Sequence, residues 1–169
     1  ESILYFALKN KDMTATINNC TFSENLQSLL KIDSESDPSN SISFDQCNFQ
    51  GNKVQESYTV FNLKDLNPLE LSITNCNFTN KGYCLFADGD LCKTYISHCR
   101  FEKNQGKQGC AIYVTGKLAK EQEYLTIDNC QFIENTVSIE NTGRASGIVH
   151  LPLNSASFTG TNTFSNNKA

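Results

Sequence analysis

TIDNCQFIEN, residues 126–135, decides the fold, because related segments recur along the whole chain. The other copies are TINNCTFSEN (16–25), SFDQCNFQGN (43–52), SITNCNFTNK (72–81), YISHCRFEKN (95–104) and the degenerate FTGTNTFSNN (158–167). Repetition at this period is typical of a solenoid, in which each repeat buries its apolar face only against its neighbours.

Three positions of the repeated segment are nearly constant within this chain. Each Cys is followed two residues later by Phe, and Phe is followed three residues later by Asn. The Cys positions are Cys20, Cys47, Cys76, Cys99 and Cys130, and Asn162 replaces Cys in the degenerate copy. The Phe positions are Phe22, Phe49, Phe78, Phe101, Phe132 and Phe164, and the Asn positions are Asn25, Asn52, Asn104, Asn135 and Asn167. Lys81 is the exception in the third copy, where Asn80 comes one residue earlier.

Between copies lies a second short apolar segment, while the distance between successive Cys varies from 23 to 31 residues. Examples are YTVFNL from Tyr58 and CAIYV from Cys110. These segments are rich in β-branched and aromatic residues and bounded by Gly, Asn, Ser or Asp, which predicts strands. Each repeat therefore has a rigid part and a loop of variable length.

The alternation of side chains requires a sharp corner inside each copy. Ile127 and Cys130 have opposite parity but are both apolar, so both are buried only if the chain turns at Asp128-Asn129. Asn and Asp accept the left-handed conformation of such a corner better than other non-glycine residues. Equivalent corners are expected at Asn18-Asn19, Asp45-Gln46, Thr74-Asn75 and Ser97-His98, and the Asn after Phe marks a second corner.

Short strands joined by corners at constant phase predict an all-β chain, a right-handed parallel β-helix of about six coils. Residues 1–169 would form one such domain, without caps of its own. We expect this domain to be a segment excised or matured from a longer chain. The Phe series should then form a single file through the interior, with equivalent residues about 4.8 Å apart.

One copy carries a fuller motif, Phe101-Glu102-Lys103-Asn104 followed by Gly109-Cys110-Ala111-Ile112. It resembles the Phe-x-x-Asn and Gly-Gly-Ala-Ile repeats of the chlamydial polymorphic outer-membrane proteins. The first half of the motif covers nearly the whole chain, whereas Ser146-Gly147-Ile148-Val149 only distantly echoes the second. The resemblance implies a β-helical surface protein used in adhesion.

The Cys spacing matches no structural zinc site, since paired Cys-x-x-Cys groups are missing. A column of buried thiols explains the five motif Cys better. Cys84 and Cys92 flank the turn Asp88-Gly89-Asp90, which predicts a local disulfide, with Cys110 as the competing partner. We expect Asp88-Gly89-Asp90 to be an ordinary turn and not a calcium loop, because the rest of the EF-hand pattern is missing.

No catalytic, cofactor or metal site is expected from the remaining polar residues. His98 and His150 lie far apart without clustered carboxylates. Asp45 and Asp128 share a corner position but lie three coils apart, roughly 14 Å at the sheet spacing. A β-helical polysaccharide lyase or hydrolase is the alternative, and it would need acidic or basic residues stacked on adjacent coils.

The composition favours an extracellular function. A net charge of −4 argues against nucleic acid, and no apolar run is long enough to insert into a membrane. The sequons at Asn19 and Asn77 suggest N-glycosylation of a secreted or cell-surface protein. We therefore expect a non-enzymatic structural or adhesive β-helix with other surface proteins or glycans as partners.

The two ends of the sequence predict self-association. The chain begins in an apolar strand and ends at the segment that precedes such a strand in every complete coil. Two hypotheses follow: a fragment of a longer β-helix, or a protomer that stacks head to tail into a filament. We favour the filament.

Overall fold

The computed structural model describes residues 3–8, 11–26, 29–34, 39–53, 59–62, 70–87, 93–106, 109–114, 125–138, 147–151 and 156–169. Within these ranges all regular elements are β-strands, and they form three sheets. Every pair of adjacent strands is parallel, as expected when the strands of one sheet come from successive repeats.

The sheets are here named A, B and C. Sheet A contains β1 (Leu4–Leu8), β4 (Leu30–Ser34), β7 (Thr59–Asn62), β10 (Tyr83–Ala87), β14 (Ile112–Val114) and β18 (Val149–His150). Sheet B contains β2 (Thr14–Asn18), β5 (Ser41–Asp45), β8 (Glu70–Thr74), β11 (Lys93–Ser97), β15 (Leu125–Asp128) and β19 (Ala156–Thr159). Sheet C contains β3 (Thr21–Ser23), β6 (Asn48–Lys53), β9 (Asn77–Lys81), β12 (Arg100–Glu102), β13 (Gln105–Gly106), β16 (Gln131–Ile133), β17 (Thr136–Val137) and β20 (Thr163–Ser165).

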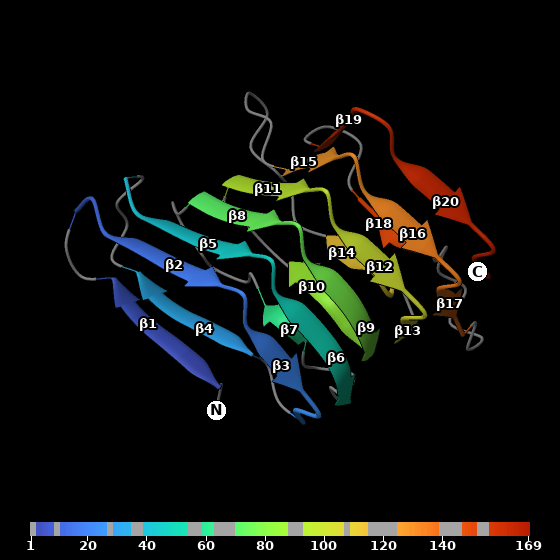
Figure 1. Ribbon diagram of the computed structural model, residues 1–169, viewed down its shortest axis with the longest axis horizontal. Helices are drawn as coiled ribbons and strands as arrows, with labels where there is room; N and C mark the ends of the chain where they lie inside the picture. The colour runs from blue at the N-terminus through green and yellow to red at the C-terminus, as the bar shows by residue number, and fades with distance from the viewer. Residues whose placement is uncertain are drawn as a thin grey trace.

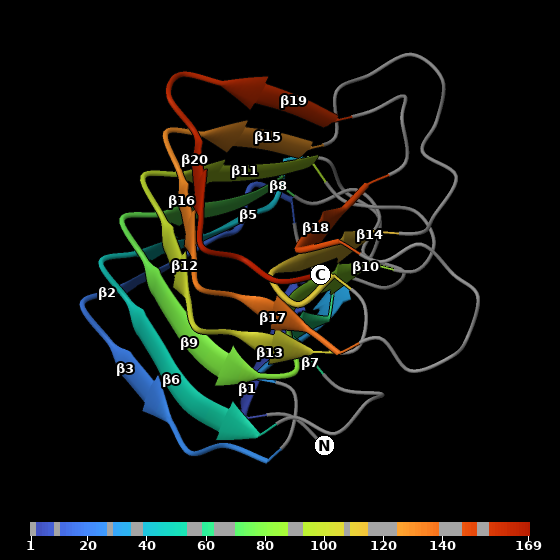
Figure 2. The ribbon, with the colours of Figure 1, turned by 90° about the vertical axis from the view of Figure 1, so that its right-hand side faces the viewer.

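The chain visits sheets A, B and C in turn, so that each circuit stacks on the one before. Figure 1 shows the N-terminal strands at one end of the stack and the C-terminal strands at the other. Figure 2 looks along the stack and shows sheets B and C meeting at a corner. This arrangement is a parallel β-helix, and the fold class predicted from the sequence is confirmed.

The corner between sheets B and C depends on one left-handed residue in each coil. The φ angles there are 53° at Asn19, 53° at Gln46, 52° at Asn75, 53° at His98 and 50° at Asn129, with Gly160 at 61°. The first five are the second residues of the predicted corner pairs, and Gly160 forms the corner of the degenerate copy. The turn lets both Ile127 and Cys130 point inward, since each is fully buried.

The second corner follows the Phe of each motif. There the residue just before the ladder Asn has a positive φ, and these residues are Glu24, Gly51, Lys103, Glu134 and Asn166. The third coil differs, because Thr79 alone separates Phe78 from Asn80, and the positive φ falls instead at Gly82 (118°). The register shifts at this point, where Gln50 pairs with Thr79 but Lys53 pairs with Lys81.

The core is built around the six motif Phe rings, which form a single stack. Neighbouring ring centroids lie 5.2, 4.7, 4.7, 5.0 and 4.5 Å apart from Phe22 to Phe164, with interplanar angles of 10° or less. Phe44 and Phe61 meet the rings of the stack edge to face. The predicted Phe column is therefore confirmed, and burial of each inner ring contributes about 1.5–3 kcal/mol.

Candidate functional site

The motif thiols also form a column, and their hydrogen bonds link successive coils. Cys47, Cys76, Cys99 and Cys130 are buried, whereas Cys20 in the first coil is half-buried. The Cys99 thiol, for example, lies 3.3 Å from Ser97 O in its own coil and 3.4 Å from Ile73 O in the coil before. The other inner thiols face the equivalent carbonyls. The column is thus part of the scaffold.

The surroundings shift the pKa values of these thiols in opposite directions, since the hydrogen bond with Cys99 lowers the pKa of Cys76 and of Cys130. Burial raises the pKa of Cys47, and the thiols of Cys130 and Cys76, together with burial, raise that of Cys99. Since the thiolate is the nucleophile and the metal ligand, the raised pKa values of Cys47 and Cys99 disfavour reaction of these two thiols at neutral pH. Among the described residues no group of three or more His, Cys, Asp or Glu side chains is placed to hold a metal ion.

Cys84 and Cys110 lie outside the column but are also buried free thiols. The Cys84 thiol donates to Asn104 Oδ1 at 3.0 Å, and burial raises its pKa well above the ordinary value. Burial likewise raises the pKa of Cys110 to about 12. Cys92 and the Asp88-Gly89-Asp90 turn lie outside the described residues, but Cys84 is a free thiol, so the predicted Cys84–Cys92 disulfide is wrong.

The ladder Asn residues join the coils through both backbone and side-chain hydrogen bonds. Asn104 shows the pattern, since its N and its Nδ2 donate to Asn135 Oδ1 at 3.0 and 2.9 Å. Its Nδ2 also donates to Phe78 O of the preceding coil at 3.0 Å. Asn25, Asn52, Asn135 and Asn167 belong to the same ladder.

The third coil contributes Asn80 to this ladder, a place that was not predicted from the sequence. Asn80 Oδ1 accepts from Asn52 Nδ2 at 2.8 Å, and Asn80 N donates to Asn104 Oδ1 at 2.7 Å. The sequence signal for this change is the spacing Phe-x-Asn in this copy, where the other copies have Phe-x-x-Asn. The missing residue is the one that forms the left-handed corner in the other coils.

The acidic corner residues are also held in inter-coil hydrogen bonds. Asp45 Oδ1 accepts from Thr74 Oγ1 at 2.7 Å and from Asn75 Nδ2 at 2.8 Å. The hydrogen bond from Thr74 is the main reason that the pKa of Asp45 is lowered. In the same way the hydrogen bond from Thr159 lowers the pKa of Asp128. Both carboxyl groups are therefore ionised at neutral pH and already accept hydrogen bonds from neighbouring coils.

Ser97, His98 and Asp128 meet at the corner without the geometry of a hydrolase triad. Ser97 Oγ lies 2.6 Å from His98 Nδ1 and donates to Asp128 Oδ2 at 3.3 Å. In a triad the histidine takes the serine proton and the acid orients the histidine, whereas here the serine bonds to the acid itself. Ser97 is also buried, which leaves its oxygen closed to a substrate.

His150 packs as an aromatic ring on sheet A. Its ring lies 4.9 Å from that of Tyr113, which lies 5.4 Å from that of Tyr83. The three side chains come from β18, β14 and β10, consecutive strands of that sheet. The stack gives His150 a packing role.

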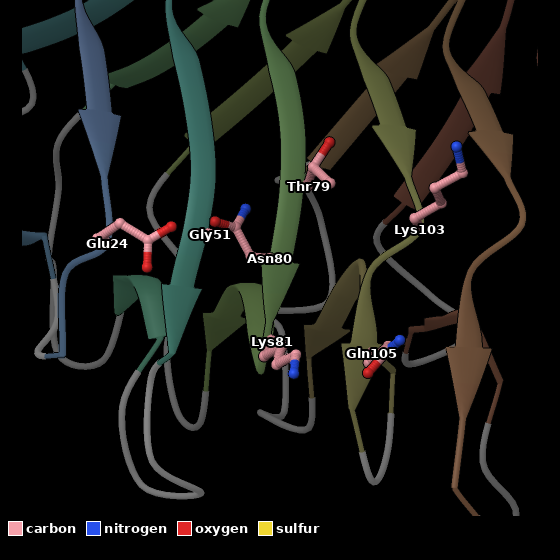
Figure 3. Close-up of a pocket in the computed structure, with 7 residues that line it drawn as sticks. All are labelled: Glu24, Gly51, Thr79, Asn80, Lys81, Lys103 and Gln105. Atoms are coloured by element: carbon pink, nitrogen blue, oxygen red, sulfur yellow. The ribbon is translucent and has the colours of Figure 1, made fainter.

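A surface notch lies at the second corner, where the third coil lacks its left-handed residue. It encloses about 320 Å³ and is lined by Glu24, Gly51, Thr79, Asn80, Lys81, Lys103 and Gln105. Figure 3 shows Glu24 reaching toward Gly51 at one side and Lys103 on the other. Gly51 (φ 65°) packs against the Glu24 side chain, since a Cβ there would collide with the Glu24 carboxylate.

Charges of both signs border the notch. Lys103 Nζ lies 3.5 Å from Glu102 Oε1 and 3.8 Å from Glu134 Oε2, so its charge is partly balanced by neighbours outside the notch. Such long, exposed ion pairs hold a side chain weakly. The notch therefore offers an amide, a carboxylate and two ammonium groups to a polar ligand.

The two sequon asparagines are exposed, but in different settings. Asn19 is the left-handed residue of the first-coil corner, next to half-buried Cys20. Asn77 begins β9 on the outer face of sheet C, and Thr79 of its sequon lines the notch.

The chain belongs to the right-handed β-helix family, whose model, described as the right handed beta helix region, matches residues 6–169. No curated protein and no solved structure matches the chain. The family includes both enzymes and non-enzymes, so membership fixes the architecture and leaves the activity open. The narrower resemblance to the chlamydial repeats is not confirmed and stays a prediction. Within the described ranges no helix is both long and apolar enough to span a bilayer.

Proposed function

We propose that this protein is a non-enzymatic structural or adhesive β-helix displayed outside the cell. The observation that supports this proposal is that the thiol, amide and carboxylate side chains of the motif hold successive coils together. Thiols, amides and the corner carboxylates all form hydrogen bonds between coils. A rod held in this way presents broad lateral faces, which suits a surface that contacts partners without transforming them.

The spacing of the acidic residues supports this proposal. Strand pairing places Asp45, Thr74, Ser97 and Asp128 in one row on successive coils. The two carboxyls are thus separated by two neutral residues, roughly 14 Å at the strand spacing. Carboxyl pairs that hydrolyse glycosides lie no more than about 9.5 Å apart.

A substrate screen tests the absence of catalysis. Purified protein is incubated with acidic and neutral polysaccharides, and new reducing ends and unsaturated products are measured. We expect no turnover by the unaltered protein or by the variants Asp45→Asn and Asp128→Asn. Turnover that either substitution abolishes would overturn the proposal.

The alternative function is carbohydrate binding or cleavage, and the notch is the observation that favours it. Glu24, Lys103 and Gln105 carry groups that can hydrogen-bond to sugar hydroxyls. Titration calorimetry with a panel of oligosaccharides tests this function. Saturable binding that Lys103→Ala abolishes, and that Lys93→Ala on sheet B leaves intact, would favour the alternative.

Extracellular display predicts glycan at the exposed sequons. We expect more complete occupancy at Asn77, which lies on an open strand face, than at Asn19, which lies in a tight corner. Intact-mass analysis of protein from its own cells, before and after enzymatic deglycosylation, measures this. Mass unchanged by deglycosylation, together with an intracellular location by immunostaining, would contradict display outside the cell.

A further inference from the structure

Hydrogen-bond donors that lack acceptors gather at the notch. The Thr79 hydroxyl, the Lys81 ammonium and the Gln105 amide are exposed there, and these groups have no partner among the described residues. Thr79 and Lys81 lie on the outer face of β9, roughly 6.8 Å apart along the strand. Gln105 of β13 pairs with Lys81. The three groups therefore stand over one small area of sheet C.

Asn80 lines the same notch, and its amide is the exception in the ladder. Asn52, Asn104 and Asn135 each donate Nδ2 to oxygens in both neighbouring coils. Asn80 Nδ2 instead contacts Cys84 Sγ at 3.9 Å, while the Cys84 thiol donates to Asn104 Oδ1. Sulfur is a weak acceptor, and Asn80 is 3% exposed. A buried amide that lacks an oxygen acceptor therefore lies beside the notch, where leaving it unpaired costs free energy.

The two sides of the notch differ in charge. Lys81 forms no ion pair within the described ranges, and Lys103 is only partly balanced by its long contacts with glutamates. Glu24 lies on the other side, with its carboxylate packed against Gly51 (Figure 3). Two strand steps, about 9.6 Å, separate the coils of Glu24 and Lys81. A negatively charged group beside Lys81 therefore avoids contact with the Glu24 carboxylate.

We propose that the notch binds an oxyanion, a sulfate or phosphate group, which accepts hydrogen bonds from Thr79, Lys81 and Gln105. A tetrahedral oxyanion presents oxygens in several directions, which suits donors that come from two strands, and its bonds to an ammonium group are charge-assisted. An oxygen held there also gives Asn80 Nδ2 an acceptor. The notch encloses about 320 Å³, so room remains for a molecule that carries the anionic group. The site goes beyond the proposed structural function and does not depend on it.

Titration calorimetry with sodium sulfate and sodium phosphate at low ionic strength tests the site. We expect saturable binding of one ion per chain. Lys81→Gln should weaken it about tenfold, because a hydrogen bond to a charged group is lost. Lys93→Gln removes the same charge from sheet B and should leave the affinity unchanged. The absence of saturable binding, or an equal loss in the two variants, would overturn the inference.

Glu24→Gln provides a test of opposite sign. This substitution keeps the size of the side chain and removes a negative charge about 9.6 Å from the coil of Lys81. The affinity for sulfate should rise by about two- to fourfold at low ionic strength, and the gain should shrink as salt is added. An affinity that does not rise would contradict a site in the notch.

Nuclear magnetic resonance of the side-chain amides locates the bound ion. The signals of Asn80 and Gln105 should shift with sulfate and saturate at the calorimetric midpoint. Gln131 is exposed elsewhere on sheet C, where its Oε1 accepts from Arg100, and its signal is the control. Shifts at Gln131 that equal those at Gln105 would show unspecific binding and overturn the inference.

Galactose 6-sulfate and galactose distinguish the source of the anion. Tighter binding of the sulfated sugar than of inorganic sulfate assigns the site to an ester on a larger molecule, and equal binding assigns it to the free ion. Both results support an oxyanion site. Galactose that binds as tightly as its sulfate ester would overturn the inference, yet it would leave the structural function to be judged by the substrate screen.

Discussion

At the residue scale, the interior is specified by side chains that recur at fixed positions. Phe101 is 1% exposed and stacks on Phe78 and Phe132 at 4.7 and 5.0 Å. Asn104 connects to both neighbouring coils through the amide ladder. Each such residue therefore stabilises two coil junctions.

Phe101→Ala should reduce the free energy of unfolding by roughly 3–5 kcal/mol, because it leaves a cavity between two rings. Phe164→Ala should cost less, since that ring is already half-exposed. Urea denaturation followed by circular dichroism measures both. Equal losses for the two variants would contradict a buried inner column.

His98 illustrates a residue whose backbone conformation matters more than its ring. At φ 53° it adopts the left-handed conformation, which β-branched residues tolerate poorly. We expect His98→Val to destabilise by roughly 1–2 kcal/mol, whereas His98→Asn should be nearly neutral. Thermal unfolding compares them, and greater damage from the Asn variant would instead point to a specific role for the imidazole.

At the element scale, much of the architecture could be predicted from the repeat. The corners at Asn19 and Asn129 followed from side-chain parity, and the Phe column followed from the constant spacing. The place of Asn80 and the notch beside it were missed, because a one-residue deletion changes which residue bends the chain. The stack of His150 on Tyr113 depends on the register between strands that are far apart in the sequence. That register could not be predicted, because the loops between the strands vary in length.

The thiols outside the motif make the fold sensitive to alkaline pH. Burial raises the pKa of Cys110 from its ordinary value of 9.0 to about 12, so the unfolded thiol ionises first. The contribution of this thiol to the free energy of unfolding is fully present below pH 9. Between pH 9 and 12 that contribution falls by up to about 1.4 kcal/mol for each pH unit. Urea midpoints across this range, with Cys110→Ala as the comparison, measure the effect. An equally steep fall in that variant would refute this assignment.

At the scale of the whole molecule, the protein is a rod whose length comes from coil stacking. The three sheets run through the stack from the N-terminal to the C-terminal coil (Figure 1). Loops of variable length leave the corners unaffected, because inter-coil hydrogen bonds and the aromatic stack set the register. The proposed surface function depends on this column.

The distance between Thr21 and Thr163 tests the stacked column most directly. Spin labels at Thr21→Cys and Thr163→Cys, in a Cys20→Ser/Cys92→Ser background diluted with unlabelled protein, report it by double electron–electron resonance. Five strand steps separate the two sites along sheet C, so the account predicts a single narrow distance of about 24 Å, broadened only by the label linkers. A distribution that is broad, or that is centred far from that value, would contradict the stacking of the coils.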